Sequence, residues 1–227
     1  MKRGKKYLEA LKKIDKNKAY SISEGVTLAK QTSYVKFDES IEIVIRLNIE
    51  QKHTIRGSMS LPNSIESKEK RVVVFAEGNY AEDARKAGAD YVGLDDLIEK
   101  IKGGWLEFDV AIATPDVMKS LGKLGPILGK RGLMPNPKDG TVTQEITKAV
   151  SEFKKGKINY RADKTGIVHN KIGKVSMDDA KVLENIKALY DEILRKKPSD
   201  IKGEYIKSIY LCTTMGPGIK IDKLSLK

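Results

Sequence analysis

The sequence predicts an α+β domain formed by both ends of the chain, with a three-layer α/β domain inserted between them. The outer segments contain strands that alternate apolar and polar residues, which is typical of an antiparallel sheet with one wet face. The middle of the chain alternates short apolar runs with helical segments, which is typical of a parallel sheet covered on both faces. Antiparallel segments on both sides of a parallel block indicate that one domain interrupts the other.

The N-terminal segment is predicted to form two helices and a strand. Residues 1–18 carry eight Lys or Arg against Glu9 and Asp15, and their apolar residues recur at helical spacing, so a basic amphipathic helix is expected. A second helix is predicted over Ser23–Tyr34, with Ser23 as its N-cap. Ser40–Ile49 then alternates apolar and polar residues closely enough to predict a long strand.

The C-terminal segment is predicted to form a hairpin, a helix and a last strand. Lys157–Ala162 and Gly166–Ile172 flank four residues with the composition of a hairpin turn. Ser176–Asp179 is expected to cap a helix that runs to about Arg195. Tyr205–Thr213 is predicted to be the last strand.

The middle of the chain follows the order strand, helix, strand, helix, strand. The predicted elements are Arg71–Ala76, Tyr80–Ala87, Tyr91-Val92, Asp95–Lys102 and Phe108–Ala113. This order is typical of a parallel sheet whose connections are helices.

The basic charge is concentrated in the outer segments. The chain holds 43 Lys and Arg against 31 Asp and Glu, a net charge of +12 that favours a polyanionic partner. Residues 68–157 hold 16 basic and 14 acidic residues, and the rest of the chain holds 27 and 17. We therefore expect an RNA-binding α+β domain formed by residues 1–67 and 158–227, and an inserted α/β domain formed by residues 68–157.

Membrane, disulfide and metal chemistry are disfavoured by the composition. No apolar run approaches the roughly eighteen residues of a membrane span, so no membrane partner and a cytoplasmic location are expected. The single cysteine, Cys212, excludes an internal disulfide and is expected to be a small core residue in a strand. His53 and His169 lie far apart without nearby carboxylate spacing, so no metal site is expected.

A nucleotide-dependent enzyme is the alternative from another class. A strand, a glycine and a helix begin Rossmann-type sites, but Glu77–Ala81 holds one glycine and lacks the phosphate-binding fingerprint. The acidic pairs Asp38-Glu39, Asp95-Asp96 and Asp178-Asp179 all stand at element starts, where carboxylates serve as caps. We therefore expect no catalytic residues and no cofactor.

The most unusual stretch is the glycine- and proline-rich segment Gly122–Gly140. Its Gly129-Lys130 is followed by Arg131 where a phosphate-binding loop has Ser or Thr, so a nucleoside triphosphate site is disfavoured. We expect a long loop whose cations suit a phosphate backbone, with an ordinary solvated loop as the alternative.

Several motifs, in order along the whole chain, resemble the family of the first large-subunit ribosomal protein, L-one. They are Phe37–Glu42, Ile112–Asp116, Leu128–Lys138, Gly140–Thr143, Tyr160-Arg161, Asp163-Lys164 and Thr213–Pro217. The resemblance implies a split α+β domain with an inserted Rossmann-like domain. It also implies binding to the stalk of large-subunit rRNA, assistance in release of deacylated exit-site tRNA, and repression of its own operon mRNA. We expect a monomer when the protein is free.

The resemblance also implies which residues contact RNA. They are Lys36, Phe37, Ser40, Glu42, Lys164, Thr165, Lys171, Ser208, Thr214, Met215 and Gly216, with Arg131 and Lys138 as further candidates. The chemistry fits, because lysines neutralise phosphates, hydroxyls and a carboxylate reach 2′-OH groups or base edges, and apolar side chains contact unstacked bases.

Overall fold

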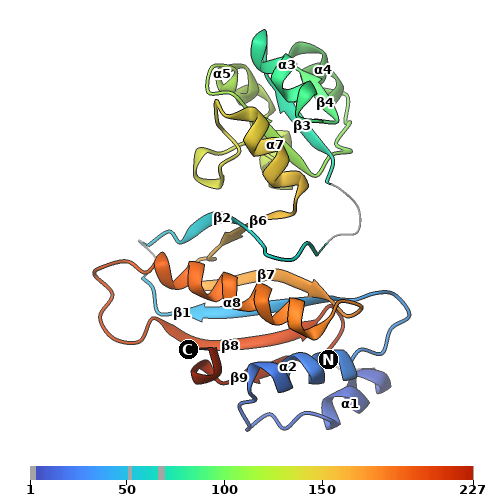
Figure 1. The fold of residues 1–227 in the computed structure, drawn as a ribbon, viewed down its shortest axis with the longest axis vertical. Helices are drawn as coiled ribbons and strands as arrows, with labels where there is room; N and C mark the ends of the chain where they lie inside the picture. The colour runs from blue at the N-terminus through green and yellow to red at the C-terminus, as the bar shows by residue number, and fades with distance from the viewer. Residues whose placement is uncertain (1–3, 51–52, 66–69, 227) are drawn as a thin grey trace. The chain divides into compact units, whose positions relative to one another are not determined.

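The computed structural model describes residues 4–50, 53–65 and 70–226, and the chain divides into two compact units (Figure 1). The first unit comprises Met1–Ile55, Leu61–Ile65 and Tyr160–Lys227. The second comprises Arg56–Ser60 and Glu66–Asn159. The predicted domain boundary between residues 67 and 68 lies outside the described residues.

The first unit is built on an antiparallel sheet of four strands in the order β7-β1-β8-β9. Their bounds are β1 Ser40–Leu47, β7 Ile167–Lys174, β8 Ile206–Thr213 and β9 Ile219–Ile221. Every second residue of β1 is buried, from Ile41 to Leu47, which confirms the predicted alternation. The prediction missed β9, because three residues between glycine and aspartate carry too short a pattern.

Among the described elements, helices cover one face of this sheet. The helices of the first unit are α1 Lys5–Lys12, α2 Ile22–Gln31, α8 Asp179–Arg195 and the 3-10 helix η3 Lys223–Leu226. Helix α8 packs on β7, and α2 packs on β8 and β9 and against α8 (Figure 1). Gly25 allows the close approach of α2, since a Cβ atom there would lie 2.3 Å from Cδ1 of Ile221. The opposite face of the sheet carries no helix among the described elements.

Two helix starts differ from the prediction. Helix α2 is capped by Ser21, not Ser23: the Ser21 hydroxyl accepts a hydrogen bond from the Glu24 amide and the Glu24 carboxylate accepts one from the Ser21 amide. Helix α8 begins at Asp179 with Asp178 at the N-cap position, and no side chain caps it. The predicted cap residue Ser176 instead bonds Asp38.

The predicted hairpin turn exists, but its first strand joins another sheet. The Gly166 amide donates to Asp163 O at 3.1 Å and the Asp163 amide donates to Ile167 O at 2.9 Å, which closes the turn. Strand β6 (Lys157–Arg161), however, pairs with β2 (Arg56–Ser60) in a sheet of two strands. Composition predicts the turn, but it does not determine which strand becomes the partner.

The second unit contains the predicted parallel sheet, with strand order β4-β3-β5. Its strands are β3 Val72–Phe75, β4 Tyr91–Gly93 and β5 Val110–Ala113. All four residues of the central strand β3 are fully buried. One face packs against α3 (Asn79–Lys86) and α7 (Ile146–Lys154), and the other packs against α4 (Asp95–Lys102), α5 (Met118–Leu121) and α6 (Gly125–Arg131). The predicted three-layer arrangement is therefore present in this unit.

The prediction of a long loop over Gly122–Gly140 is wrong. The segment folds as the 3-10 helix η1 (Gly122–Leu124), α6 and the 3-10 helix η2 (Pro137–Asp139). Leu124 and Leu128 are fully buried in the core beside α4, and this burial outweighs the low helix propensity of the glycines. Only short connections between these helices remain irregular.

Candidate nucleic-acid interface

The helix-free face of the four-stranded sheet, here called the open face, gathers polar and charged side chains in cross-strand rows. The register places Lys171, Glu42 and Cys212 in one row across β7, β1 and β8. The next row contains His169, Val44, Tyr210 and Lys220, and the third contains Ile167, Arg46 and Ser208. These rows extend from Glu42 to Arg46, about 13 Å along β1, and the whole eight-residue strand is about 23 Å long.

Most of the predicted RNA-contacting residues lie on or around this open face. Glu42, Lys171 and Ser208 lie within its rows, and Ser40 begins β1 on the same side. Lys164 and Thr165 lie in the turn that precedes β7. Lys36 and Phe37 precede β1, while Thr214, Met215 and Gly216 follow β8, so these five lie at the opposite end. The structure therefore brings the eleven residues together along one sheet of the first unit.

Two exposed apolar side chains border the open face at one end. Phe37 is 56% exposed and Met215 is 49% exposed. Apolar side chains of this size in water are suited to stacking against an unpaired base or a ribose. The Thr214 amide donates to Ser40 O at 3.1 Å, which joins the Thr213–Pro217 turn to the start of β1.

Gly216 has a structural role that the sequence did not reveal. A Cβ atom at this position would lie 2.3 Å from Oγ1 of Thr213. Side chains of ordinary size therefore conflict with the turn itself, whether or not RNA is close.

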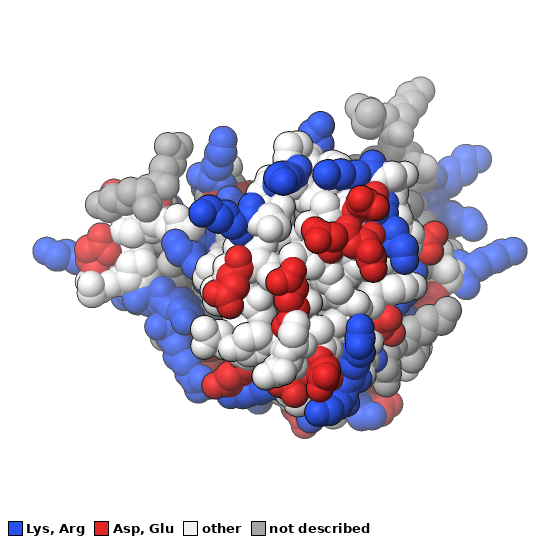
Figure 2. All heavy atoms as spheres, turned by 90° about the horizontal axis from the view of Figure 1, so that it is seen from above, with Lys and Arg blue, Asp and Glu red and all other residues white. Residues whose placement is uncertain are grey.

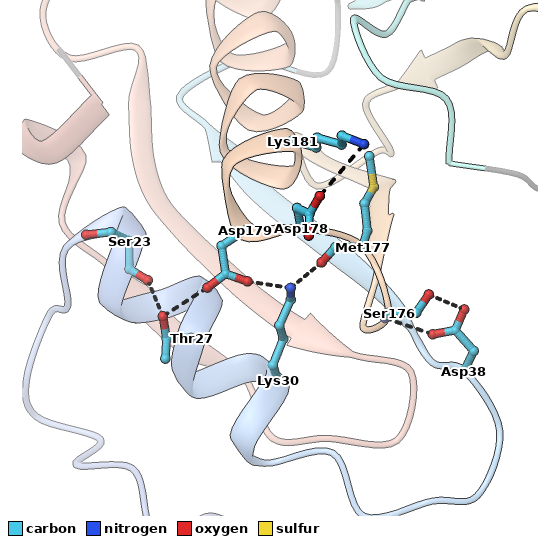
Figure 3. A network of polar contacts seen from close by, with 9 residues as sticks. All are labelled: Ser23, Thr27, Lys30, Asp38, Ser176, Met177, Asp178, Asp179 and Lys181. Carbon is cyan, nitrogen blue, oxygen red and sulfur yellow. Dashed lines mark hydrogen bonds and ion pairs between the residues drawn. The ribbon is translucent and has the colours of Figure 1, made fainter.

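The segment before β1 is fixed by a polar network (Figure 3). The Asp38 carboxylate accepts hydrogen bonds from the amide of Ser176 at 3.1 Å and from its hydroxyl at 2.8 Å, and the Lys174 ammonium lies 3.6 Å away. Desolvation raises the pKa of Asp38, but these hydrogen bonds and the lysine outweigh it, so the pKa lies below its usual range. Lys30 joins α2 to the same region through Met177 O and Asp179.

At the other end, Lys164 lines a hollow of about 460 Å³. The hollow is also lined by His53, Thr54, Arg161, Ala162 and Asp163. The Asp163 carboxylate accepts hydrogen bonds from the Ile167 amide at 2.8 Å and from the hydroxyl and amide of Thr165 at 2.7 and 2.8 Å, and these bonds lower the pKa of Asp163. The Thr165 hydroxyl thus shapes the turn, while Lys164 and Arg161 stay exposed for a phosphate.

Sequence reasoning missed several residues of the open face. Arg46, Val44, His169, Tyr210 and Lys220 occupy the two rows beyond Glu42. The signal was available for Val44 and Arg46, since both are in phase with Ser40 and Glu42 on an alternating strand. The residues of β7, β8 and β9 need the register, which only the structure supplies.

Cys212 is not the core residue that the sequence predicts. Its side chain is half-buried on the open face, directly across from Glu42. Burial raises the pKa of the Cys212 thiol, and the negative charge of Glu42 adds to this effect. The thiol is therefore a poor nucleophile near neutral pH.

Arg131 and Lys138 belong to the second unit, on α6 and η2, and both are exposed. Beyond the carboxyl ends of the parallel strands stand Glu77, Asp95, Asp96 and Asp116, all exposed. Nucleotide phosphates bind at that edge in folds of this type, and four carboxylates there repel them. In the face of the molecule shown in Figure 2, acidic and basic side chains are interspersed among uncharged ones.

Comparison with known proteins decides the class of the chain. Residues 29–217 match the family described as Ribosomal protein L1p/L10e family. The chain belongs to the ribosomal protein L1p/L10e family. Membership confirms the predicted resemblance and the prediction of a ribosomal protein without enzymatic activity.

Individual relatives of the L1p/L10e family match over nearly their whole length. The chain is 53% identical over 221 residues to "Large ribosomal subunit protein uL1" of Borrelia garinii subsp. bavariensis, covering 97% of both chains. The protein of the same name from Borreliella burgdorferi is also 53% identical, with the same coverage. The one from Lactobacillus acidophilus is 53% identical over 228 residues, covering 99% of both chains.

Two further observations concern the described residues only. None of their helices is long and apolar enough to cross a bilayer. No group of three His, Cys, Asp or Glu side chains among them could hold a metal ion.

Proposed function

We propose that this chain is a constituent of the large ribosomal subunit that binds the stalk of large-subunit rRNA through the open face. The observation that carries the proposal is an uncovered sheet face of about 23 Å along β1, bordered at one end by exposed Phe37 and Met215. Lys171, Arg46 and Lys220 supply positive charge along it, and Lys164 extends the charge beyond the sheet. The names of the relatives support the assignment to the large subunit.

The chain is proposed to serve two further roles. As a ribosomal protein at the exit-site stalk, the chain assists release of deacylated tRNA, and when free it represses translation of its own operon mRNA. One surface can serve both RNAs if the mRNA repeats the rRNA stalk's shape. We also propose that residues 1–67 with 158–227 form an RNA-binding α+β domain and that residues 68–157 form an inserted Rossmann-like domain.

Binding to stalk RNA as a function of salt tests the proposal. If about five phosphate contacts form, log affinity falls with log salt at a slope near −4, on the order of a hundredfold between 50 and 200 mM. Arg46→Ala is expected to lower the slope by about one, and Lys100→Ala, on α4 of the second unit, leaves it unchanged. Equal affinity for stalk RNA and an unrelated RNA of the same length rules out the proposed function.

A further inference from the structure

Glu39 is a fully buried carboxylate between two predicted RNA-contacting residues, Phe37 and Ser40. Burial of a carboxylate is costly unless hydrogen bonds compensate for lost water. Its Oε2 atom is buried without a hydrogen-bond partner in the part of the chain that the structure describes. Because the side chain is shielded from solvent, it can influence RNA binding only through the groups that it contacts.

The contacts of Glu39 join three segments of the first unit. Its Oε1 atom accepts a hydrogen bond from the Met215 amide at 2.9 Å. Its backbone oxygen accepts one from the Val175 amide at 2.9 Å, directly after β7. Glu39 therefore connects the Thr213–Pro217 turn to the end of β7 and the start of β1.

The backbone oxygen of Met215 is also hydrogen-bonded, by a residue of the segment that precedes β1. The Tyr34 hydroxyl donates a hydrogen bond to Met215 O at 2.8 Å. One residue earlier, the Ser40 amide donates to Oγ1 of Thr214 at 3.1 Å. The amide and the carbonyl of Met215 are thus both bound by side chains, while the residue as a whole is 49% exposed.

We propose that Glu39 and Tyr34 are positioning residues, which fix the Met215 backbone so that its exposed side chain is a preformed apolar contact for RNA. The proposal rests on the proposed function. Preformed groups bind more tightly, because less conformational freedom is lost on association. Neither positioning residue needs to touch the RNA.

Four variants test this proposal: Glu39→Gln, Glu39→Ala, Tyr34→Phe and the control Tyr91→Phe. Gln keeps an oxygen that can accept a hydrogen bond from the Met215 amide, so the affinity of the Glu39→Gln protein for stalk RNA should stay within about threefold of wild type. Ala removes the acceptor and should lower stalk affinity at least about tenfold, while affinity for unrelated RNA changes by less than about twofold. Tyr34→Phe should lose several-fold, and Tyr91→Phe, an exposed tyrosine of the second unit, should lose nothing.

A second measurement needs no RNA. Amide hydrogen exchange of Met215, followed by NMR in the free protein, should accelerate at least about tenfold in Glu39→Ala and remain near wild type in Glu39→Gln. If Glu39→Ala fails to fold, the stalk affinity of Tyr34→Phe decides. Wild-type affinity in both Glu39→Ala and Tyr34→Phe, or equal losses for stalk and unrelated RNA, overturns the proposal. If wild type itself shows no preference for stalk RNA, the proposed function fails, and the exchange rates still test whether Glu39 fixes the turn.

Discussion

The two larger sheets of this protein are built from strands of different apolar patterns, and their surroundings differ accordingly. In the second unit, β3 reads Val-Val-Val-Phe and is buried on both faces. In the first unit, β1 reads Ser-Ile-Glu-Ile-Val-Ile-Arg-Leu and is buried on one face only. A sheet covered on both sides serves as a scaffold, whereas a sheet covered on one side keeps a rigid surface for a ligand.

The largest expected effect comes from a matched pair of substitutions, one in each sheet. Val74→Asp places a carboxylate in the fully buried β3 and should lower the unfolding free energy of the second unit by about 4 kcal/mol or more. Val44→Asp makes the same change on the open face and should cost about 1 kcal/mol or less. Trp105, the single tryptophan, reports the second unit in urea unfolding by fluorescence, and hydrogen exchange of the β1 amides reports the first. Similar losses of unfolding free energy from both substitutions would show that the sheet face at Val44 is covered.

A second pair compares the apolar end of the open face with a cation of the second unit. Met215→Asp removes an exposed apolar contact and adds negative charge, so affinity for stalk RNA should fall at least about tenfold. Lys138→Ala removes one exposed cation on η2 and should cost less than about threefold. The ratio of stalk to unrelated RNA should change only for Met215→Asp. Equal losses in the two variants would mean that charge alone accounts for recognition.

The smallest effect concerns the thiol on the open face. Because burial and Glu42 raise the pKa of Cys212, less thiolate is present at pH 8 than in a free cysteine, and alkylation by iodoacetamide should be slow. The rate should rise with pH until the pH passes the raised pKa. Bound stalk RNA should slow the reaction further at every pH, because RNA would cover the row that contains Cys212. A rate equal to that of a cysteine peptide at pH 8 would contradict the half-buried placement.

The sequence predicts the local elements of this protein better than their partners. Helix α4 has the predicted bounds, Asp95–Lys102, because its charged termini and apolar stripe agree. The sequence does not predict the pairing of β6 with β2, because composition does not determine which distant strand becomes a neighbour. The segment Gly122–Gly140 was mispredicted because the burial of Leu124 and Leu128 outweighs the propensity of the glycines.

For the candidate site too, the sequence predicts local motifs better than contacts between distant residues. The motifs around Phe37 and Met215 could be identified from the sequence, because they resemble a known family. The hydrogen bonds of Glu39 and Tyr34 to Met215 join residues 176 and 181 positions apart, so no local pattern reveals them. Asp38 and Glu39 look alike in the sequence as a pair at a strand start. In the structure they fix different segments, the end of β7 and the turn after β8.

The strand order of the first unit also has a consequence for synthesis. Strand β1 lies between β7 and β8, but about 120 residues separate the end of β1 from the start of β7. At a synthesis rate of about 5 to 20 residues per second, roughly 6 to 24 s pass between the synthesis of β1 and that of its first partner strand, β7. The parallel sheet of the second unit has all its strands between Val72 and Ala113, so it can form earlier on the translating ribosome. A nascent chain therefore completes the open face only after β8 has emerged, so unfinished copies lack the proposed RNA-binding surface.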